Sequence, residues 1–410
     1  MEIKNLEKVA KRIIIAIKNG ERIILYGDAD LDGVSSVIIL KETIKNLNGK
    51  ISAIYFPDRE NEGYGITKKG LDYLKNFSPA LFVTLDLGIG NFKEVKIAKK
   101  FGFEVIIIDH HEILDKLPSA SIVVDPKQKG DKYPFKGLAT AGISFKLSRI
   151  LLEEKLTKKL RENFLELVAL ATIADMMPKL EENQLFIEEG FESLRNTWRP
   201  GLKAFFSITE LPKEAKVEKR TKFSLTEDFR NQLNLKEISQ KIISSLNASD
   251  KIDHLNEIYL LLTEKDERAA EDLAKKLLEK GHQRQIRIRE IVNEIEEKLL
   301  EKMPAPYNPE GIYSGKEKVI FEGRDIWSLT LLGGVASRIC KEYQTPTFLF
   351  KIDKEESQGA VRVPAKLDSV KLMQKCSKFL ETYGGHPQAS GFRIKNKNLE
   401  KFKDCLINQL

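Results

Sequence analysis

Cysteine is scarce in this chain of 410 residues, which contains only Cys340, Cys376 and Cys405. They are odd in number, widely spaced and without a Cys-x-x-Cys pair, so the pattern excludes a disulfide framework and a cysteine-rich zinc site. We therefore expect reduced thiols and a cytoplasmic protein. Long apolar runs are also lacking: the N-terminal run 13–17 is flanked by Lys, and nothing approaches the roughly 18 apolar residues of a membrane span.

A strong charge of one sign is missing as well. The formal net charge is +7, while 41% of the residues are hydrophobic, enough to build real cores. Residues 351–410 carry 12 Lys and Arg against 7 Asp and Glu, a local excess of 5 positive charges. A nucleic-acid surface is permitted there, although a slightly basic solvated surface is the simpler explanation.

The first 125 residues alternate short apolar runs with amphipathic stretches. The runs are rich in Ile and Val and continuous, as expected for strands covered on both faces; they are 22–27, 51–56, 81–86, 104–109 and 121–125. Helix-compatible stretches such as 35–47 and 91–101 lie between them. The predicted fold class is α/β with a doubly wound, mostly parallel sheet.

The rest of the chain predicts two further parts. Residues 140–200 are helical in pattern, and 266–302 contain no Pro and a single Gly with apolar residues at helical intervals, which predicts one long helix or a broken pair. The segment 303–309 then marks a linker. We expect an α/β domain over 1–200, a helical connector over 201–305 and a smaller α/β domain over 306–410.

Acidic residues follow the predicted strands. Asp28, Asp86, Asp109 and Asp125 each end or follow a run, which gathers acids along one edge of the sheet. Asp28 is joined by Asp30 and Asp32 in GDADLDGVSS. Clustered carboxylates require cations, although this segment would also serve as a polar turn that caps a helix starting near residue 34. Asp86 alone is equally compatible with a turn.

Two histidines out of five in the chain adjoin at the end of a strand, in IIIDHHE. His110 and His111 are hard to explain as packing, whereas imidazole binds Mn or Zn readily and Asp109 would orient it. Asp175 lies among apolar residues before Pro178, near an expected helix end, where a metal would satisfy its charge. Together these residues match a two-metal site that hydrolyses phosphate esters.

These motifs resemble the DHH superfamily, and specifically its RecJ-like branch. GDADLDGVSS, TLDLGIGN, IIIDHHE and LVALATIADMMPKLEENQLFIEEGF are similar to the family's conserved blocks, and PFKGLATAGISFKL to the helix start between them. LLEKGHQRQIRIREIVNEI is similar to the family's linking helix. LLGGVASRI, GAVRVP and GGHPQASGF are similar to a DHHA1 domain. Residues 1–200 would then be the DHH domain and 306–410 the DHHA1 domain.

The resemblance implies a role for each residue. One metal ion would be held by Asp28, Asp30 and Asp86, and a second by Asp32, Asp86, His110 and Asp175. Mn²⁺ is the expected ion and Mg²⁺ the alternative. His111 would contact the scissile phosphate or protonate the leaving group. Asp109 would orient the two histidines. The expected substrate-binding residues are Arg338, Arg362, Gly384, Gly385 and His386, although the Gly pair alone is also compatible with a plain tight turn.

The implied activity is exonucleolytic hydrolysis of single-stranded DNA or RNA in replication or repair. The chain resembles the archaeal RecJ-like group, whose members associate with the replication factor GINS or with Hef-type repair helicases. Two alternatives stay open: a small-substrate enzyme, either an oligoribonuclease or a nucleotide phosphatase, and a non-catalytic replication or repair scaffold. Departures such as SLNASDK, which lacks the family's usual Gly-Arg, leave recognition of the substrate end undecided.

Overall fold

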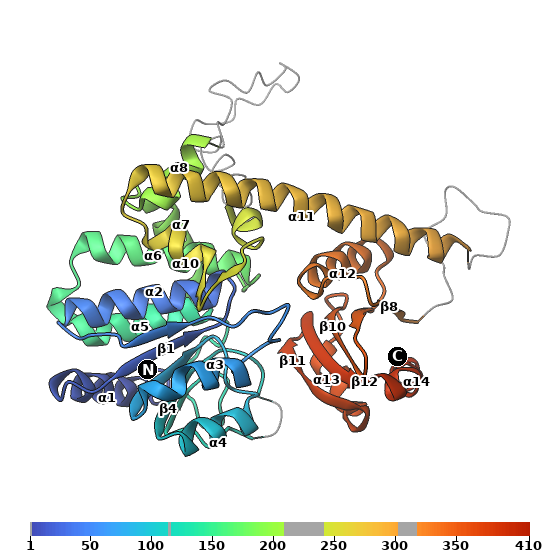
Figure 1. Ribbon diagram of the computed structural model, residues 1–410, viewed down its shortest axis with the longest axis horizontal. Coiled ribbons are helices and arrows are strands. Elements are labelled where there is room, and N and C mark those ends of the chain that lie inside the picture. Colours follow the sequence, from blue (N-terminus) through green and yellow to red (C-terminus); the bar gives the residue numbers. More distant parts are fainter. Residues whose placement is uncertain (1, 114–115, 209–241, 302–317) are drawn as a thin grey trace. The chain divides into compact units, whose positions relative to one another are not determined.

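The computed structural model describes residues 2–113, 116–208, 242–301 and 318–410, which form two compact units (Figure 1). The first unit contains Met1–Asp58 and Glu62–His282, and the second contains Arg59–Asn61 and Gln283–Leu410. The predicted linker 303–309 lies outside the described residues. The predicted connector 201–305 is divided between the two units.

The first unit is built on a parallel sheet of five strands in the order β2-β1-β3-β4-β5. The strands are β1 (Ile23–Gly27), β2 (Ala53–Tyr55), β3 (Ala80–Leu85), β4 (Phe103–Ile108) and β5 (Ile122–Val124). Each lies within one of the five predicted apolar runs or within one residue of it, which confirms the expected fold class. The order reverses direction between β1 and β3, and ligands of open α/β sheets bind at such a point.

Alternate residues of each strand enter two different cores, because side chains of a strand point to opposite faces. Leu25, Val83 and Ile106 join one core, which is covered by α1 (Leu6–Lys18), α2 (Leu31–Asn46) and α5 (Thr140–Leu152). Tyr26, Phe82 and Val105 join the other, beneath α3 (Lys68–Leu74), η1 (Lys75–Phe77) and α4 (Phe92–Lys100). Burial on both faces explains why the strands read as continuous apolar runs.

Further helices pack onto the α2–α5 side, as the green and yellow ribbons of Figure 1 show. They are η2 (Glu153–Lys155), α6 (Lys158–Ala174), α7 (Glu181–Leu194), α8 (Pro200–Ile208) and α10 (Glu257–Thr263). A hairpin of β6 (Lys251–Ile252) and β7 (Leu255–Asn256) precedes α10. The predicted long helix is a single helix, α11 (Glu267–Glu301). Its first part belongs to the first unit and its second part to the second.

The second unit contains a mixed sheet in the order β11-β12-β10-β9-β8, in which only β8 and β9 run parallel. The strands are β8 (Ile320–Arg324), β9 (Thr347–Ile352), β10 (Glu356–Arg362), β11 (Leu380–His386) and β12 (Ala389–Lys395). One core forms against α11 and α12 (Leu329–Tyr343). The other forms against α14 (Leu399–Gln409) and α13 (Ser369–Lys375), with η3 (Ser377–Phe379) and η4 (Asn396–Asn398) in the adjoining turns. The predicted smaller α/β domain is confirmed.

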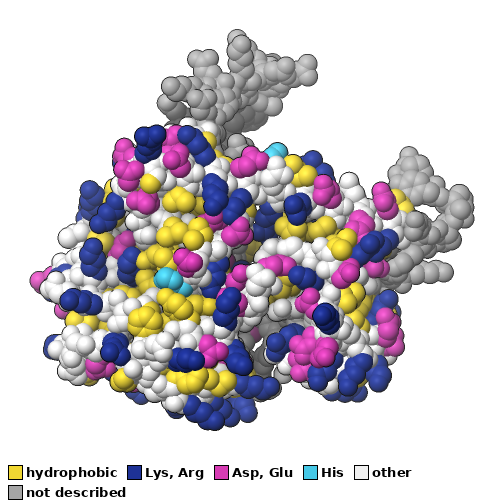
Figure 2. Space-filling view, viewed as in Figure 1, with side chains coloured by type: hydrophobic (Ala, Val, Ile, Leu, Met, Phe, Trp, Pro, Cys, Tyr) yellow, Lys and Arg dark blue, Asp and Glu magenta, His cyan; other side chains and the backbone are white. Residues whose placement is uncertain are grey.

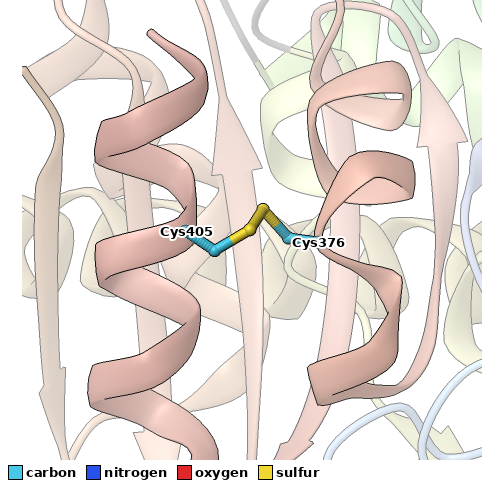
Figure 3. The surroundings of a disulfide bond; sticks show 2 residues. All are labelled: Cys376 and Cys405. Carbon is cyan, nitrogen blue, oxygen red and sulfur yellow. A yellow bond between two sulfur atoms is a disulfide. The ribbon is translucent and has the colours of Figure 1, made fainter.

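The expectation of three reduced thiols is wrong for two of them. Cys376, at the end of α13, forms a disulfide with Cys405 in α14, and their Cα atoms lie 6.0 Å apart (Figure 3). The two thiols are distant in sequence, but both helices cover the same face of the second sheet, which brings them together. Cys340 is buried and free.

Among the described helices, none is both long and apolar enough to cross a bilayer. Lys and Arg are intermixed with Asp and Glu on the face shown in Figure 2, so this face has no uninterrupted basic stripe.

Candidate metal centre

The acidic residues meet where the order of the first sheet reverses. Asp28 directly follows β1 and Asp86 directly follows β3. The two strand ends are tied together by the N–H of Asp28, which donates to the carbonyl oxygen of Leu85 at 3.1 Å. Neighbouring parallel strands end at the same edge, so two carboxylates distant in sequence lie side by side there.

The first motif departs from the expected geometry. The helix begins at Leu31, not near residue 34, and Asp30 caps it by accepting from the N–H of Gly33 at 3.0 Å. Asp32 therefore lies in the first turn of α2, not before the helix. Gly33 is required because a Cβ atom there would lie 2.4 Å from the carbonyl oxygen of Asp28. Asp30 thus caps the helix while its carboxylate also belongs to one of the groups that could hold a metal ion.

Asp86 adopts a left-handed backbone conformation, with φ at +66°, which Asp tolerates better than most residues. Its side chain is almost fully buried. His110 follows β4 and is equally buried, and its Nε2 lies 3.2 Å from Oδ1 of Asp86. The carboxylate that the family resemblance assigns to both ions thus lies beside the predicted imidazole ligand.

The six predicted metal ligands form two groups. Asp28, Asp30 and Asp86 make up the first group, and Asp32, His110 and Asp175 make up the second. Within each group the candidate ligand atoms lie within 4.8 Å of one another. His110 Nε2 lies 3.3 Å from Asp175 Oδ2 and 3.7 Å from Asp32 Oδ2. Asp175 follows the last residue of α6, as predicted. Five carboxylates and one imidazole suit hard divalent cations such as Mn²⁺ and Mg²⁺.

The electrostatics of the cluster favour the binding of cations. Burial raises the pKa of Asp32 well above its usual value, and the charges of Asp175 and Asp30 raise it further. Burial, followed by the charges of Asp32 and Asp30, has the same effect on the pKa of Asp86. A bound cation would reverse this effect, because it stabilises the ionised form that ligation needs.

Asp109 connects the two histidines. Its Oδ1 accepts from the N–H of His110 at 2.8 Å and lies 2.7 Å from Nδ1 of His111, while its Oδ2 accepts from the N–H of Ile89. Burial would raise the pKa of Asp109, but the charge and hydrogen bond of His111 hold it below its usual value. Burial likewise lowers the pKa of His111, yet Asp109 raises it to about 9. His111 therefore carries a proton at neutral pH.

Sequence reasoning missed the residues that hold the ligands in place. The segment 138–141 contacts three of them. The carbonyl oxygen of Leu138 lies 3.0 Å from His110 Nδ1, the N–H groups of Thr140 and Ala141 donate to Asp32, and the hydroxyl of Thr140 donates to Asp86. The segment lies inside PFKGLATAGISFKL, which was recognised only as a helix start. Asn256 also supports the site, because its Nδ2 donates to the carbonyl oxygen of Ala29 at 3.1 Å.

The predicted substrate-binding residues lie in the second unit. Arg338, on α12, donates to Oε1 of Gln285 on α11 at 2.5 Å. Arg362 ends β10, and its Nη1 donates to the carbonyl oxygen of Val361. Gly384, Gly385 and His386 form the end of β11, where Gly384 pairs with Gly391 and His386 with Ala389.

Fold and site together define a two-unit α/β protein with a buried cluster of carboxylates and histidine suited to two neighbouring divalent ions, a type of centre used by phosphoesterases. Residues 22–172 match the DHH family, N-terminal domain, and residues 316–410 match the DHHA1 domain. The chain belongs to the DHH family, in the RecJ-like form that carries both domains.

Known relatives match nearly the whole chain. It is 32% identical over 407 residues to the single-stranded-DNA-specific exonuclease RecJ of Bacillus subtilis, covering 99% of this chain and 48% of the relative. The crystal structure of an exonuclease RecJ bound to manganese is 25% identical with a TM-score of 0.71, covering 100% of this chain and 95% of that one. The Thermus thermophilus RecJ–Mn²⁺ structure (24% identity, TM-score 0.75, 100% and 55% coverage) shares the fold. The chain thus spans about half the length of the Bacillus relative.

Proposed function

We propose that this protein is a metal-dependent exonuclease that hydrolyses phosphodiester bonds of single-stranded nucleic acid to mononucleotides. The observation that carries the proposal is the pair of ligand groups at the end of the sheet. Asp86 belongs to one group and lies beside His110, which belongs to the other. The names of the relatives, single-stranded-DNA-specific exonucleases, support the same class of activity and favour DNA as substrate.

Two divalent ions fit the residues present, with Mn²⁺ the expected ion and Mg²⁺ the alternative. Asp28, Asp30 and Asp86 would hold one ion; Asp32, Asp86, His110 and Asp175 would hold the other. When bound, the ions would supply positive charge against the scissile phosphate and activate water. The nearby oxygens and the imidazole nitrogen support this assignment.

His111 is the proposed proton donor to the leaving oxygen. Its Nδ1 lies against Asp109, so a proton on Nε2 is the one that His111 can transfer. Asp109 keeps the imidazole oriented and, through its charge, protonated up to about pH 9. The same carboxylate holds the N–H of His110, which links the proton donor to a metal ligand.

The second unit is proposed to bind the strand through Arg338, Arg362, Gly384, Gly385 and His386. The register places Gly384, Gly391 and Ala360 in one row across β11, β12 and β10, and His386, Ala389 and Arg362 in a row two residues away on the same face. A Cβ atom at Gly384 would meet nothing within 4 Å, so the backbone is open there. Small residues beside a guanidinium suit a sugar–phosphate chain.

Several finer expectations belong to the same proposal. The catalytic DHH domain would extend over about 1–200, the connector over 201–305 and the substrate-binding DHHA1 domain over 306–410. Membership of the archaeal group, activity on RNA, and association with GINS or with a Hef-type helicase stay predictions, the last testable by co-purification. A cytoplasmic location also stays a prediction, and the disulfide removes part of its original basis.

The proposal is tested with the full chain, Mn²⁺ and single strands of DNA and RNA labelled at either end. We expect stepwise release of mononucleotides, abolished by Asp86→Ala and by His110→Ala. Asp72→Ala is the matched control, because Asp72 is an exposed acid on α3 of the same unit that pairs with Lys75 at 3.6 Å. The labelled end that is released first gives the polarity.

Cleavage of dinucleotides without cleavage of longer strands would overturn the exonuclease proposal in favour of the small-substrate enzyme. Binding of Mn²⁺ without cleavage of any substrate would favour the scaffold. Activity that survives both Asp86→Ala and His110→Ala would refute the assignment of the centre.

A further inference from the structure

The segment 138–141 contacts ligands from three separate parts of the first unit. His110 follows β4, Asp32 lies in α2 and Asp86 follows β3. A carbonyl oxygen only accepts, so the oxygen of Leu138 at 3.0 Å places the proton of a neutral His110 on Nδ1. That leaves the lone pair of Nε2 toward the carboxylates, as metal ligation requires.

Thr140 contacts two of these ligands by itself. Its N–H donates to Oδ2 of Asp32 at 2.8 Å, while its hydroxyl donates to Oδ1 of Asp86 at 3.0 Å. The N–H of Ala141 donates to the other oxygen of Asp32 at 2.8 Å. The two N–H groups belong to the first turn of α5, where an anion is favoured. The backbone bonds persist with any side chain, whereas the bond to Asp86 depends on the hydroxyl.

Burial makes this hydroxyl important. Thr140 is fully buried and Asp86 is 2% exposed, so water cannot readily replace the lost donor. Asp86 is also the carboxylate proposed to serve both ions. A change in its orientation would therefore affect the whole centre, not one side of it.

We infer that Thr140 is a positioning residue of the metal centre, whose hydroxyl orients Asp86 so that the two divalent ions bind tightly. The inference rests on the proposed function, because it requires that ions bind to this cluster. It assigns to Thr140 no contact with substrate or with the reacting atoms. Residues that orient metal ligands typically change metal affinity by about 10- to 100-fold when replaced.

Thr140→Val removes the hydroxyl but keeps the branched shape and nearly the same volume, and Thr140→Ala is a second variant without a hydroxyl. Thr140→Ser restores the donor. The matched control is Thr43→Val in α2, since Thr43 is also fully buried but its hydroxyl donates to the carbonyl oxygen of Ile39 in its own helix.

The measurement is calorimetric titration of the metal-free full chain with Mn²⁺, together with the thermal unfolding midpoint before metal is added. We expect Thr140→Val and Thr140→Ala to weaken both binding steps by about 10- to 100-fold. Thr140→Ser and Thr43→Val should stay within about threefold of the wild type. A purely structural role would lower the metal-free midpoint of Thr140→Val without weakening the binding of Mn²⁺ to the folded chain.

The outcomes separate this inference from the function on which it rests. If the wild type binds no Mn²⁺, the metal centre and the inference both fail. If the wild type binds two ions and the variants without the hydroxyl bind them equally well, only the role of Thr140 fails. A loss of affinity in Thr43→Val equal to that in Thr140→Val would also overturn it.

Discussion

Reduction of the Cys376–Cys405 disulfide should destabilise the second unit by about 3.6 kcal/mol. The two cysteines are 29 residues apart, and a cross-link stabilises mainly by restricting the unfolded chain. For a loop of about 29 residues the loop-closure relation gives an entropy change of about −12 cal/mol/K, which is about 3.6 kcal/mol at 25 °C. Reduction is the appropriate perturbation because it leaves both side chains in place.

Guanidinium unfolding followed by tryptophan fluorescence would measure this change in one unit at a time. The chain has two tryptophans: Trp327 is buried in the second unit and Trp198 is 43% exposed in the first. In a Trp198→Phe chain, fluorescence reports the second unit alone. With a denaturant slope of about 4 kcal/mol/M, reduction should lower its midpoint by about 1 M.

The control is the double variant Cys376→Ala/Cys405→Ala, whose midpoint should not respond to the reductant. In the reciprocal Trp327→Phe chain, the first unit should unfold at the same midpoint with and without reductant. A shift below about 0.2 M in the second unit, or an equal shift in both units, would refute the loop-closure reasoning.

Two further predictions concern buried acids of the first unit. Asp109→Asn removes the charge that raises the pKa of His111 to about 9, so protonated His111 should persist only below about pH 6.5. Activity at pH 8 should fall about 30-fold and recover toward pH 6; an unchanged pH–rate profile would contradict this. Burial, then the charge of Asp109, raises the pKa of Asp125 to about 8, so the folded chain retains a proton that the unfolded chain releases near pH 4. The free energy of unfolding should therefore fall by up to about 1.4 kcal/mol per pH unit as the pH rises from about 4 to about 8. Asp125→Asn should flatten this pH dependence in unfolding curves. An unchanged slope would argue against a protonated Asp125.

Local patterns in the sequence were sufficient for much of the fold. Buried parallel strands form continuous runs rich in Ile and Val, and four of the five runs end in or are followed by an Asp, so both the sheet and the edge that carries the site were predictable. The same reasoning predicted one long helix or a broken pair over 266–302, and the structure has the single helix α11.

Local sequence patterns could not predict the contacts between distant segments. Thr140 lies 108 residues from Asp32, and nothing in the residues around either one indicates that a helix start would hold that carboxylate. Cys376 and Cys405 meet only because two helices cover one face of a sheet that the sequence outlines less clearly. The early start of α2 was missed because Asp30 serves as both cap and candidate ligand.

The left-handed backbone at Asp86 restricts how this position can evolve. Asn and Gly adopt that conformation readily but carry no charge, while Glu keeps the charge but is poorly suited to the conformation and longer by one carbon. No single replacement therefore preserves both the turn and the carboxylate. Every substitution of Asp86 is therefore expected to impair either the turn or the metal site. A homologous chain that has lost this Asp should have lost the metal centre as well.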